Sequence, residues 1–384
     1  MQVSTSRRAF LAPFATLAAR AAQIRPVRIT AFRTRKFSIR QRDFLFLEVQ
    51  TDAGLTGLGE GSLPGRVDIV EKALEWLAPF FVGQDHGGIE DHWNRAYYQL
   101  SRWRDGSVLN TALAALDIAL WDLEAKRFGV PVWRLLGAGQ SKPLRVYYSH
   151  WSQDVNPRTP AALAKLAVET RNQGWSAVKW IAFKGGSDSE RQRRLVAEVK
   201  AVREAAGPDF GIALELAETF TVRTAIELAR ALAPYDVLFL EEPTLRESPQ
   251  ALGDVAAASP IPIATGEGLV TRYEFRTLLD HKGARIIQPD VIHCGGITEL
   301  RRIASLAETY LVEISPHMWY GPVAHTASIH AIAASRNFLI QEWDGVNDRP
   351  FTEWTRGTYP VPAKGAVKLP SGPGLGIEMD FALL

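Results

Sequence analysis

The chain has 384 residues, of which 46% are hydrophobic and 22% charged, an ordinary globular composition long enough for two domains. A formal net charge of +2 without a long basic run argues against nucleic acid as a partner. No apolar stretch approaches the ~20 residues that span a bilayer, so we expect no membrane partner, and the single cysteine, Cys294, excludes an intramolecular disulfide.

Residues 1–22 predict a leader outside the fold. Arg7 and Arg8 form a twin-arginine pattern, which weakly apolar residues 12–19 and small residues through Ala22 follow. This pattern resembles a bacterial Tat-type export signal and predicts a periplasmic protein. Because Arg20 interrupts the apolar stretch, a disordered leader on a cytoplasmic protein is the alternative.

Residues 23–139 predict a compact α+β domain. Residues 27–30 and 44–49 alternate as strands do, and the turn at 51–57 carries Asp and Gly. Residues 67–82 and 108–128 repeat apolar side chains at helical spacing. Two strands followed by a group of helices are typical of an α+β arrangement.

Residues 140–360 predict a parallel (β/α) barrel. Amphipathic helical segments, for example 187–206, 221–233 and 296–308, lie between short apolar strands. An open Rossmann-like sheet is the alternative, but no Gly-x-Gly-x-x-Gly follows the first strand. Residues 361–384 are loop material that we expect to return to the first domain. The predicted strands end near Ser149, Ile181, Leu216, Glu241, Gly266, Pro289, Ser315 and Gln341.

Three carboxylates, Glu215, Glu241 and Glu267, end strands at equal intervals of 26 residues. This interval is one strand–helix–strand step, so the side chains should stand on adjacent strands about 4.8 Å apart. Any one of them could instead cap a helix or pair with an arginine. Three at equal pitch favour a Mg²⁺ site, because that ion prefers oxygen ligands.

Asp290 and His317 lie 27 residues apart at the ends of the next two strands. A carboxylate beside an imidazole orients it and raises its basicity, which suits a general base. His293 is close to Asp290 in sequence, but its glycine-rich turn favours a hydrogen-bonded loop histidine. Glu342, on the last strand, could supply a hydrogen bond or a proton on the far side of the substrate.

Lys179 has the inward parity of its strand. A cation there could bind a substrate carboxylate or offset the charge of an enolate. A structural ion pair with one of the three glutamates is equally compatible with the sequence.

Mg²⁺ beside a His–Asp dyad suits removal of a proton α to a carboxylate, because the cation stabilises the dianionic enediolate. The intermediate can then be reprotonated, which gives racemisation or epimerisation, or it can expel a β-hydroxyl, which is dehydration.

The motifs together resemble the enolase superfamily, in its mandelate racemase and muconate lactonising enzyme family, from Ile24 to Asp380. Residues 266–275 resemble the acid-sugar dehydratases, the galactonate type in particular. The resemblance rests on residues 112–122, 131–137 and 287–299 and on Glu241-Glu242-Pro243, Gly266-Glu267 and Ser315-Pro316-His317.

The resemblance implies a modified (β/α)7β TIM-like barrel with an α+β N-terminal capping domain. It implies that Glu215, Glu241 and Glu267 bind Mg²⁺ and that Asp290 and His317 form the catalytic dyad. Capping loops at 33–42 and 62–66 would close over the substrate, and a homo-oligomer is expected.

Three positions depart from the family pattern. Glu215 replaces the usual Asp ligand, Ala217 replaces a histidine of the galactonate dehydratases, and Ile181 replaces the second lysine of the racemases. A single histidine can abstract the α-proton and protonate a hydroxyl that leaves from the same face, whereas epimerisation needs a base on each face.

The favoured function is therefore dehydration of an acid sugar to a 2-keto-3-deoxy acid. The alternatives are a racemase or epimerase in which Lys179 or Lys184 is the second base, a cycloisomerase, and a non-catalytic protein that binds metal and acid sugars.

A polyhydroxylated carboxylate needs a polar and aromatic binding site. His150, Trp319 and Tyr320 follow strand ends and could contact the substrate, as could Trp151. Buried packing is the alternative for each aromatic side chain. Arg40, Arg42 and Arg104 could reach the substrate from the first domain.

Overall fold

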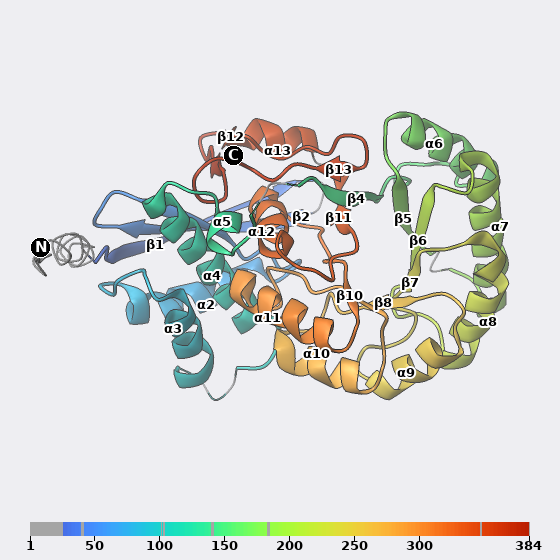
Figure 1. Cartoon of the computed structure of the whole chain (residues 1–384), viewed down its shortest axis with the longest axis horizontal. Coiled ribbons are helices and arrows are strands. Elements are labelled where there is room, and N and C mark those ends of the chain that lie inside the picture. The colour runs from blue at the N-terminus through green and yellow to red at the C-terminus, as the bar shows by residue number, and fades with distance from the viewer. Residues whose placement is uncertain are drawn as a thin grey trace, which may run out of the picture.

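The computed structural model describes residues 26–39, 42–100, 102, 104–139, 142–182, 185–345 and 348–383. The predicted leader at 1–22, Arg40 and Lys184 lie outside these residues. A small antiparallel sheet with helices adjoins a curved parallel sheet that is lined on its outside by helices (Figure 1).

The first domain begins with an antiparallel sheet in the order β1-β2-β3. The strands are β1 (Ile29–Ile39), β2 (Arg42–Thr51) and β3 (Thr56–Glu60). In β2 four consecutive side chains, Phe44 to Leu47, are buried, because helices cover one face of the sheet and the C-terminal segment covers part of the other. The helices are α2 (Val67–Phe81), α3 (Ile89–Asn94), a π-helical turn (Arg95–Gln99), α4 (Ser107–Phe128) and α5 (Val132–Leu135).

The barrel strands are parallel and follow one another in chain order, and the last, β11, pairs with the first, β4. A bridge between Ile314 of β10 and Phe338, just before β11, completes the ring. The barrel interior away from the strand ends is filled by Tyr147, Phe239 and smaller apolar side chains. The strands are β4 (Leu144–Ser149), β5 (Ala177–Ile181), β6 (Gly211–Glu215), β7 (Phe239–Glu241), β8 (Ile263–Thr265), β9 (Ile286–Ile287), β10 (Glu313–Ile314) and β11 (Gln341–Trp343).

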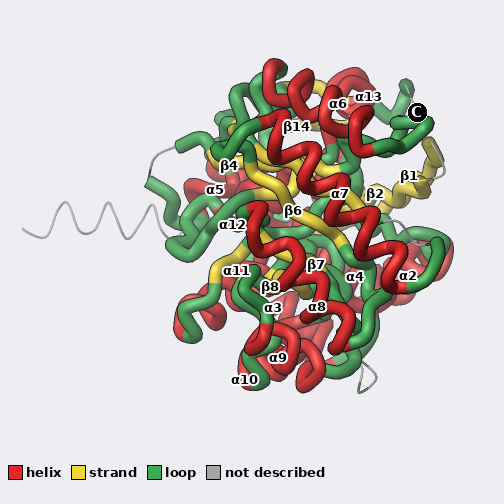
Figure 2. The backbone as a smooth tube through the Cα atoms, turned by 90° about the vertical axis from the view of Figure 1, so that its right-hand side faces the viewer, coloured by secondary structure: helices red, strands yellow, loops and turns green. Residues whose placement is uncertain are grey.

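One helix follows each barrel strand from β4 to β10, which confirms the predicted (β/α)7β barrel with an α+β capping domain. Figure 2 shows α7 and α8 on the outside of the strands. Side-chain caps set where several helices begin: Ser187 and Glu190 form a capping box, and Thr221 caps α8. The helices are α6 (Pro160–Asn172), α7 (Asp188–Ala206), α8 (Val222–Leu232), α9 (Pro249–Ala258), α10 (Thr271–Asp280), α11 (Gly296–Thr309) and α12 (Pro322–Ile332).

Helix α4 joins the two domains because it is buried on nearly all sides. On the capping side, β3 approaches it through glycines: a Cβ on Gly59 would lie 1.9 Å from the Ala115 carbonyl oxygen. On the barrel side, the Asp117 carboxylate accepts hydrogen bonds from the Thr298 N–H (3.0 Å) and hydroxyl (2.6 Å) of α11. The capping domain therefore has a fixed position over the barrel.

The C-terminal segment contains α13 (Asp348–Trp354), β12 (Thr355–Gly357), β13 (Ala366–Val367) and β14 (Ile377–Met379). Its Leu375 N–H donates to Asp122 of α4 (2.7 Å), and Phe381 packs on Phe46 of β2. The segment thus contacts the capping domain.

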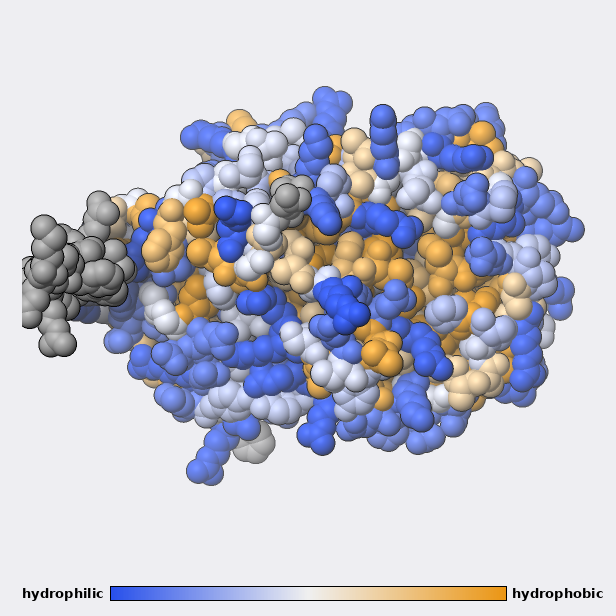
Figure 3. Space-filling view, viewed as in Figure 1, coloured by the Kyte–Doolittle hydropathy of each residue, from blue (hydrophilic) through white to orange (hydrophobic). Residues whose placement is uncertain are grey.

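Hydrophilic side chains dominate the rim of the barrel half, and hydrophobic ones gather toward its middle (Figure 3). Among the described residues no helix combines the length and apolarity needed to cross a bilayer.

We predict that Gly59→Ala lowers the free energy of unfolding by at least about 2 kcal/mol, because the new methyl group must displace the α4 backbone. Gly139→Ala is the control, since no atom lies within 4 Å of a Cβ at that position. Denaturant unfolding measures both, and equal stabilities for the two variants would contradict this account of the interface.

Candidate active site

A cavity of about 460 Å³ opens at the C-terminal ends of the barrel strands, where active sites of this architecture lie. The capping domain contributes Leu63, Pro64 and Arg66 to its wall. The barrel contributes Ser149, His150, Lys179, Trp180, Ile181, Glu215, Ala217, Glu218, Glu242, Arg246, Glu267, His317, Trp319, Tyr320 and Glu342.

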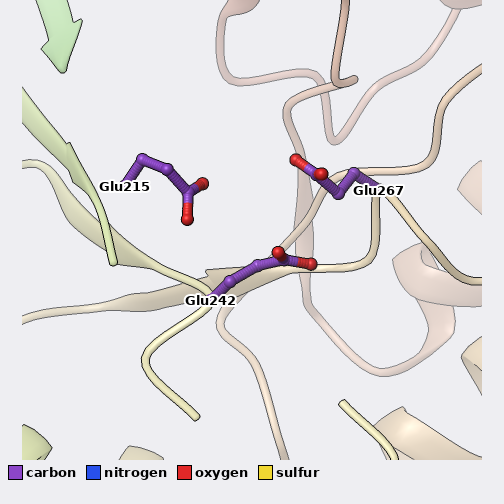
Figure 4. A group of neighbouring side chains, drawn as sticks. All are labelled: Glu215, Glu242 and Glu267. Atoms are coloured by element: carbon purple, nitrogen blue, oxygen red, sulfur yellow. The ribbon is translucent and has the colours of Figure 1, made fainter. Parts of the chain in front are cut away.

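Three glutamates converge on one side of this cavity (Figure 4). Glu215 ends β6, Glu242 follows β7, and Glu267 follows β8. One carboxylate oxygen of each lies within 4.8 Å of the others. Glu242 reaches the group through a left-handed backbone conformation, with φ of 43°. Side chains from the ends of three successive strands thus meet at one point, with Glu242 in the place where the spacing predicts Glu241.

Glu241, the predicted middle ligand, is held differently from the other two. It pairs with Glu215 in the strand register, so the two carboxyl groups are neighbours. However, its Oε1 lies 2.5 Å from the Lys179 Nζ, and its Oε2 accepts from the Gln288 side chain (2.6 Å). Glu242 is therefore the third member of the close oxygen cluster in this structure, and Glu241 as a ligand stays a prediction.

The cluster carries more negative charge than its surroundings neutralise. Burial, together with the adjacent Glu241, raises the pKa of Glu215 well above its usual range. Burial and the neighbouring Glu267 raise the pKa of Glu242 to about 9. Burial also raises the pKa of Glu267, although His317 opposes the shift.

The residues present fit a divalent cation. The Glu215 Oε2 and Glu242 Oε1 atoms are buried without a hydrogen-bond donor, which is costly for a carboxylate. A hard cation with oxygen ligands would satisfy these atoms and remove the repulsion between the carboxylates. Glu215, Glu241, Glu242 and Glu267 are the side chains that could hold it.

His317 and Asp290 form the predicted dyad. The His317 Nδ1 lies 2.7 Å from the Asp290 Oδ2, and the other Asp290 oxygen accepts from the Ile292 N–H (2.9 Å). This carboxylate therefore fixes the proton on Nδ1. The opposite ring nitrogen, Nε2, is directed at the carboxylates, 3.3 Å from the Glu267 Oε2. Burial lowers the pKa of His317, but Glu267 and Glu342 outweigh it and raise the value to about 10.

Lys179 and Glu342 form a buried ion pair of 2.9 Å beside the dyad. Burial lowers the pKa of Lys179, but Glu241 and Glu342 outweigh it and keep the lysine charged. Burial raises the pKa of Glu342, but Lys179 outweighs it and lowers the value to about 2. The structure also shows the predicted ion pair of Lys179 with one of the three glutamates, Glu241, at 2.5 Å, and a contact of Lys179 with the substrate stays a prediction. Glu342, which also accepts from the Met318 N–H (3.1 Å), is a carboxylate at neutral pH rather than an acid.

Three of the four predicted substrate-binding residues line the cavity: His150, Trp319 and Tyr320. Arg42, the fourth, is not among the lining residues. Its guanidinium pairs with Asp344 and lies over the Trp319 ring, 4.4 Å from the centroid. Arg42 thus supports Trp319, and a direct substrate contact stays a prediction.

The remaining predicted candidates lie away from the cavity wall. The His293 Nδ1 is 2.9 Å from the Thr111 hydroxyl, as expected for a hydrogen-bonded loop histidine. Trp151 packs edge-on against Trp180 in the barrel core. Arg104 lies over the ring of Tyr97, 5.3 Å from its centroid.

Several residues that line the cavity were not predicted from the sequence. Glu242 was passed over because strand parity favours its neighbour Glu241, although the Glu-Glu-Pro motif contains both. Arg246 was missed since it follows β7 in a loop, where it pairs with Glu218 (3.2 Å). The sequence positions of Glu218 and Arg246 do not repeat at the strand–helix interval, so they could not be predicted as neighbours. Their ion pair depends on how two loops approach each other.

Comparison with known proteins identifies the family to which the chain belongs. Residues 15–137 match the family described as mandelate racemase / muconate lactonizing enzyme, N-terminal domain, and residues 162–383 match that described as enolase C-terminal domain-like. The chain is 36% identical over 347 residues to a D-galactonate dehydratase of Ralstonia nicotianae, covering 89% of this chain and 90% of that protein. It is 34% identical to a D-galactonate dehydratase of Xanthomonas euvesicatoria pv. vesicatoria, with the same coverage.

Solved structures agree with this placement. A putative dehydratase from Salmonella enterica serovar Typhimurium superimposes with a TM-score of 0.87 at 29% identity, over 93% of this chain and 97% of the other. A putative galactarate dehydratase from Agrobacterium radiobacter, solved with bound sodium and L-malate, gives a TM-score of 0.83 at 34% identity, over 92% and 93%. The dehydratase names agree with the hydro-lyase class expected from the sequence. The chain belongs to the mandelate racemase and muconate lactonizing enzyme family of the enolase superfamily.

Proposed function

We propose that this enzyme is an acid-sugar dehydratase that removes the proton α to the substrate carboxylate and eliminates a β-hydroxyl, giving a 2-keto-3-deoxy acid. The observation that carries the proposal is the His317–Asp290 dyad, whose Nε2 is directed into the cavity and lies 3.3 Å from the Glu267 carboxylate. The dehydratase relatives support the same reaction class.

His317 is the proposed base. Its Nδ1–H is held by Asp290, so Nε2 takes the α-proton and the imidazolium that forms is stabilised by the same carboxylate. The protonated ring then gives this proton to the β-hydroxyl as the Cβ–O bond breaks, and water leaves. His317 thus returns to its starting state, and the enol product becomes the ketone.

A bound Mg²⁺ would be held by Glu215, Glu241, Glu242 and Glu267. Its positive charge would offset the charge of the substrate carboxylate. It would also offset the glutamate charges that raise the pKa of His317, so that the imidazole could act as a base. Lys179 adds a fixed charge on the same side of the cavity. His150, Trp319 and Tyr320 border the space in which the hydroxyl-bearing chain would lie.

Dehydration is favoured over epimerisation because Lys179 is a poor second base. Its ammonium group lies between two carboxylates at 2.5 and 2.9 Å, which stabilise the charged form. Ile181 and Ala217 line the cavity at positions where the family resemblance implies a basic residue, and neither side chain can carry a proton.

Epimerisation is the second candidate, and His150 is the observation that favours it. Burial lowers the pKa of this cavity-lining histidine, so its ring is neutral near pH 7. Its Nδ1 lies 3.0 Å from the Ser149 hydroxyl, which leaves Nε2 available as a second base.

Two further expectations stay predictions. The leader predicts a periplasmic location, and the family resemblance predicts a homo-oligomer.

We predict that a panel of aldonates and aldarates with Mg²⁺ contains a substrate that gives a 2-keto acid, detected as its semicarbazone or by NMR. His317→Asn should stay folded, since the amide can still hydrogen-bond Asp290, and should lose turnover at least ~100-fold. Ketone formation that survives in His317→Asn would remove the base assignment. If wild-type enzyme forms no ketone from any acid, the dehydratase proposal is contradicted.

We predict that Mg²⁺ affinity rises between pH 6 and pH 9. The pKa of Glu242 is raised to about 9, so at neutral pH the cation must displace a proton from the cluster, and higher pH removes this competition. Titration calorimetry in two buffers of different ionisation enthalpy measures both the affinity and the released protons. If the Mg²⁺ affinity were constant between pH 6 and pH 9, the claim that the cation displaces a proton from the glutamate cluster would be contradicted.

The variants Glu241→Gln and Glu242→Gln identify the third ligand in the same experiment. We expect Glu241→Gln to lower the Mg²⁺ affinity more than Glu242→Gln does, by at least ~10-fold, because Glu241 is the residue that pairs with Glu215 in the strand register. Lys179 would still have Glu342 as an ion-pair partner if Glu241 bound the cation. A larger loss in Glu242→Gln would show that the oxygen cluster of this structure is the metal site.

A further inference from the structure

Glu60 is a fully buried carboxylate between the capping domain and the barrel that the proposed reaction does not use. It is the last residue of β3, opposite Phe46 of β2. Its Oε1 accepts from the Gly321 N–H (2.7 Å), and its Oε2 accepts from the Ala324 N–H (2.9 Å). Gly321 immediately precedes α12 and Ala324 lies in its first turn, so Glu60 caps the start of this helix from another domain.

This contact is close and charge-assisted. The N-terminal N–H groups of a helix have no partner within the helix and carry partial positive charge, which a carboxylate satisfies. Gly321 lets the carboxylate approach, because a Cβ there would lie 2.7 Å from the Glu60 Oε1. The Ser62 hydroxyl donates a further bond to Oε1 (2.7 Å), so both oxygens of Glu60 are held.

The two segments that Glu60 joins are both walls of the cavity. On the barrel side, His317, Trp319 and Tyr320 immediately precede Gly321. On the capping side, Leu63, Pro64 and Arg66 follow Glu60 within six residues. One carboxylate therefore fixes the base-bearing segment and the substrate-covering loop relative to each other.

We propose that Glu60 is a positioning residue for catalysis: its carboxylate holds the His317–Tyr320 segment against the Leu63–Arg66 loop through the first turn of α12. Glu60 lies behind the cavity wall and does not touch the substrate. This inference rests on the proposed function for its kinetic effect, whereas its structural effect is independent of the reaction.

Glu60→Gln tests the proposal with little change in shape. The side-chain amide has only one oxygen, so one of the two α12 N–H groups faces an NH₂ group instead of an acceptor. One control variant disturbs the same interface without breaking this link. Asp122→Asn changes another fully buried carboxylate, which accepts from the Leu58 and Leu375 N–H groups.

Two measurements are made on each full-length variant at a temperature where it is folded. Hydrogen–deuterium exchange by mass spectrometry follows peptides that cover residues 61–66 and 317–324. Steady-state kinetics gives kcat and KM. We expect Glu60→Gln to speed exchange in both peptides and to lower kcat by at least ~10-fold, because small displacements of a catalytic group are costly. The Asp122→Asn control should keep kcat within about twofold of wild type.

The proposal is overturned if Glu60→Gln leaves exchange in these peptides unchanged, if it keeps wild-type kcat, or if Asp122→Asn lowers kcat equally at the same loss of stability. If wild-type enzyme turns over none of the acids in the panel, the proposed function has failed, and the exchange measurement alone decides the role of Glu60.

Discussion

The constraint on which the structure depends is the crowding of buried carboxylates at one end of the barrel. Glu215, Glu241, Glu242 and Glu267 meet there, with Asp290 and Glu342 nearby. The nearest cations are Lys179, 2.5 Å from Glu241, His317, 3.3 Å from Glu267, and Arg246, 3.8 Å from Glu242. Burial alone makes such a group expensive, as the raised pKa values of Glu215 and Glu242 show. These residues therefore fit a cation, which would remove the repulsion between the carboxylates.

The rest of the fold holds these groups in place. Adjacent parallel strands deliver the acids at the pitch of the sheet, and the Asp290 and Glu342 carboxylates fix the ring and the backbone around His317. Helix α4 joins the capping domain to the barrel through Asp117, and Glu60 makes a second link close to His317 in the sequence. The position of the capping domain and that of the His317 segment are thus connected by buried hydrogen bonds as well as by apolar packing.

Much of this arrangement follows from the sequence because it is periodic. The eight strand ends, the barrel, the Asp290–His317 pair and the convergence of acids all depend on a repeated strand–helix step. What the sequence did not reveal depends on contacts between distant segments. Strand parity favoured Glu241, whereas Lys179 and Gln288 hold that side chain and Glu242 reaches the cluster through a positive φ. The pairing of the Arg42 guanidinium with Asp344, 302 residues away, could not be predicted either, and a contact of Arg42 with the substrate stays a prediction. Strand β1 continues to Ile39, beyond the predicted residue 30, because pairing with β2 stabilises an exposed arginine-rich stretch.

The central claim is that one base, His317, acts on the α-carbon. NMR of the acid sugar recovered from partial turnover in D₂O tests this claim most directly, because it reports both exchange of the α-proton and the configuration at that carbon. The account predicts that any deuterium at the α-carbon enters with retention of configuration, and that exchange disappears in His317→Asn. If the wild-type enzyme accumulated the deuterated epimer, and a His150→Asn variant did not, the single-base mechanism would be contradicted and a second base on the opposite face would be assigned.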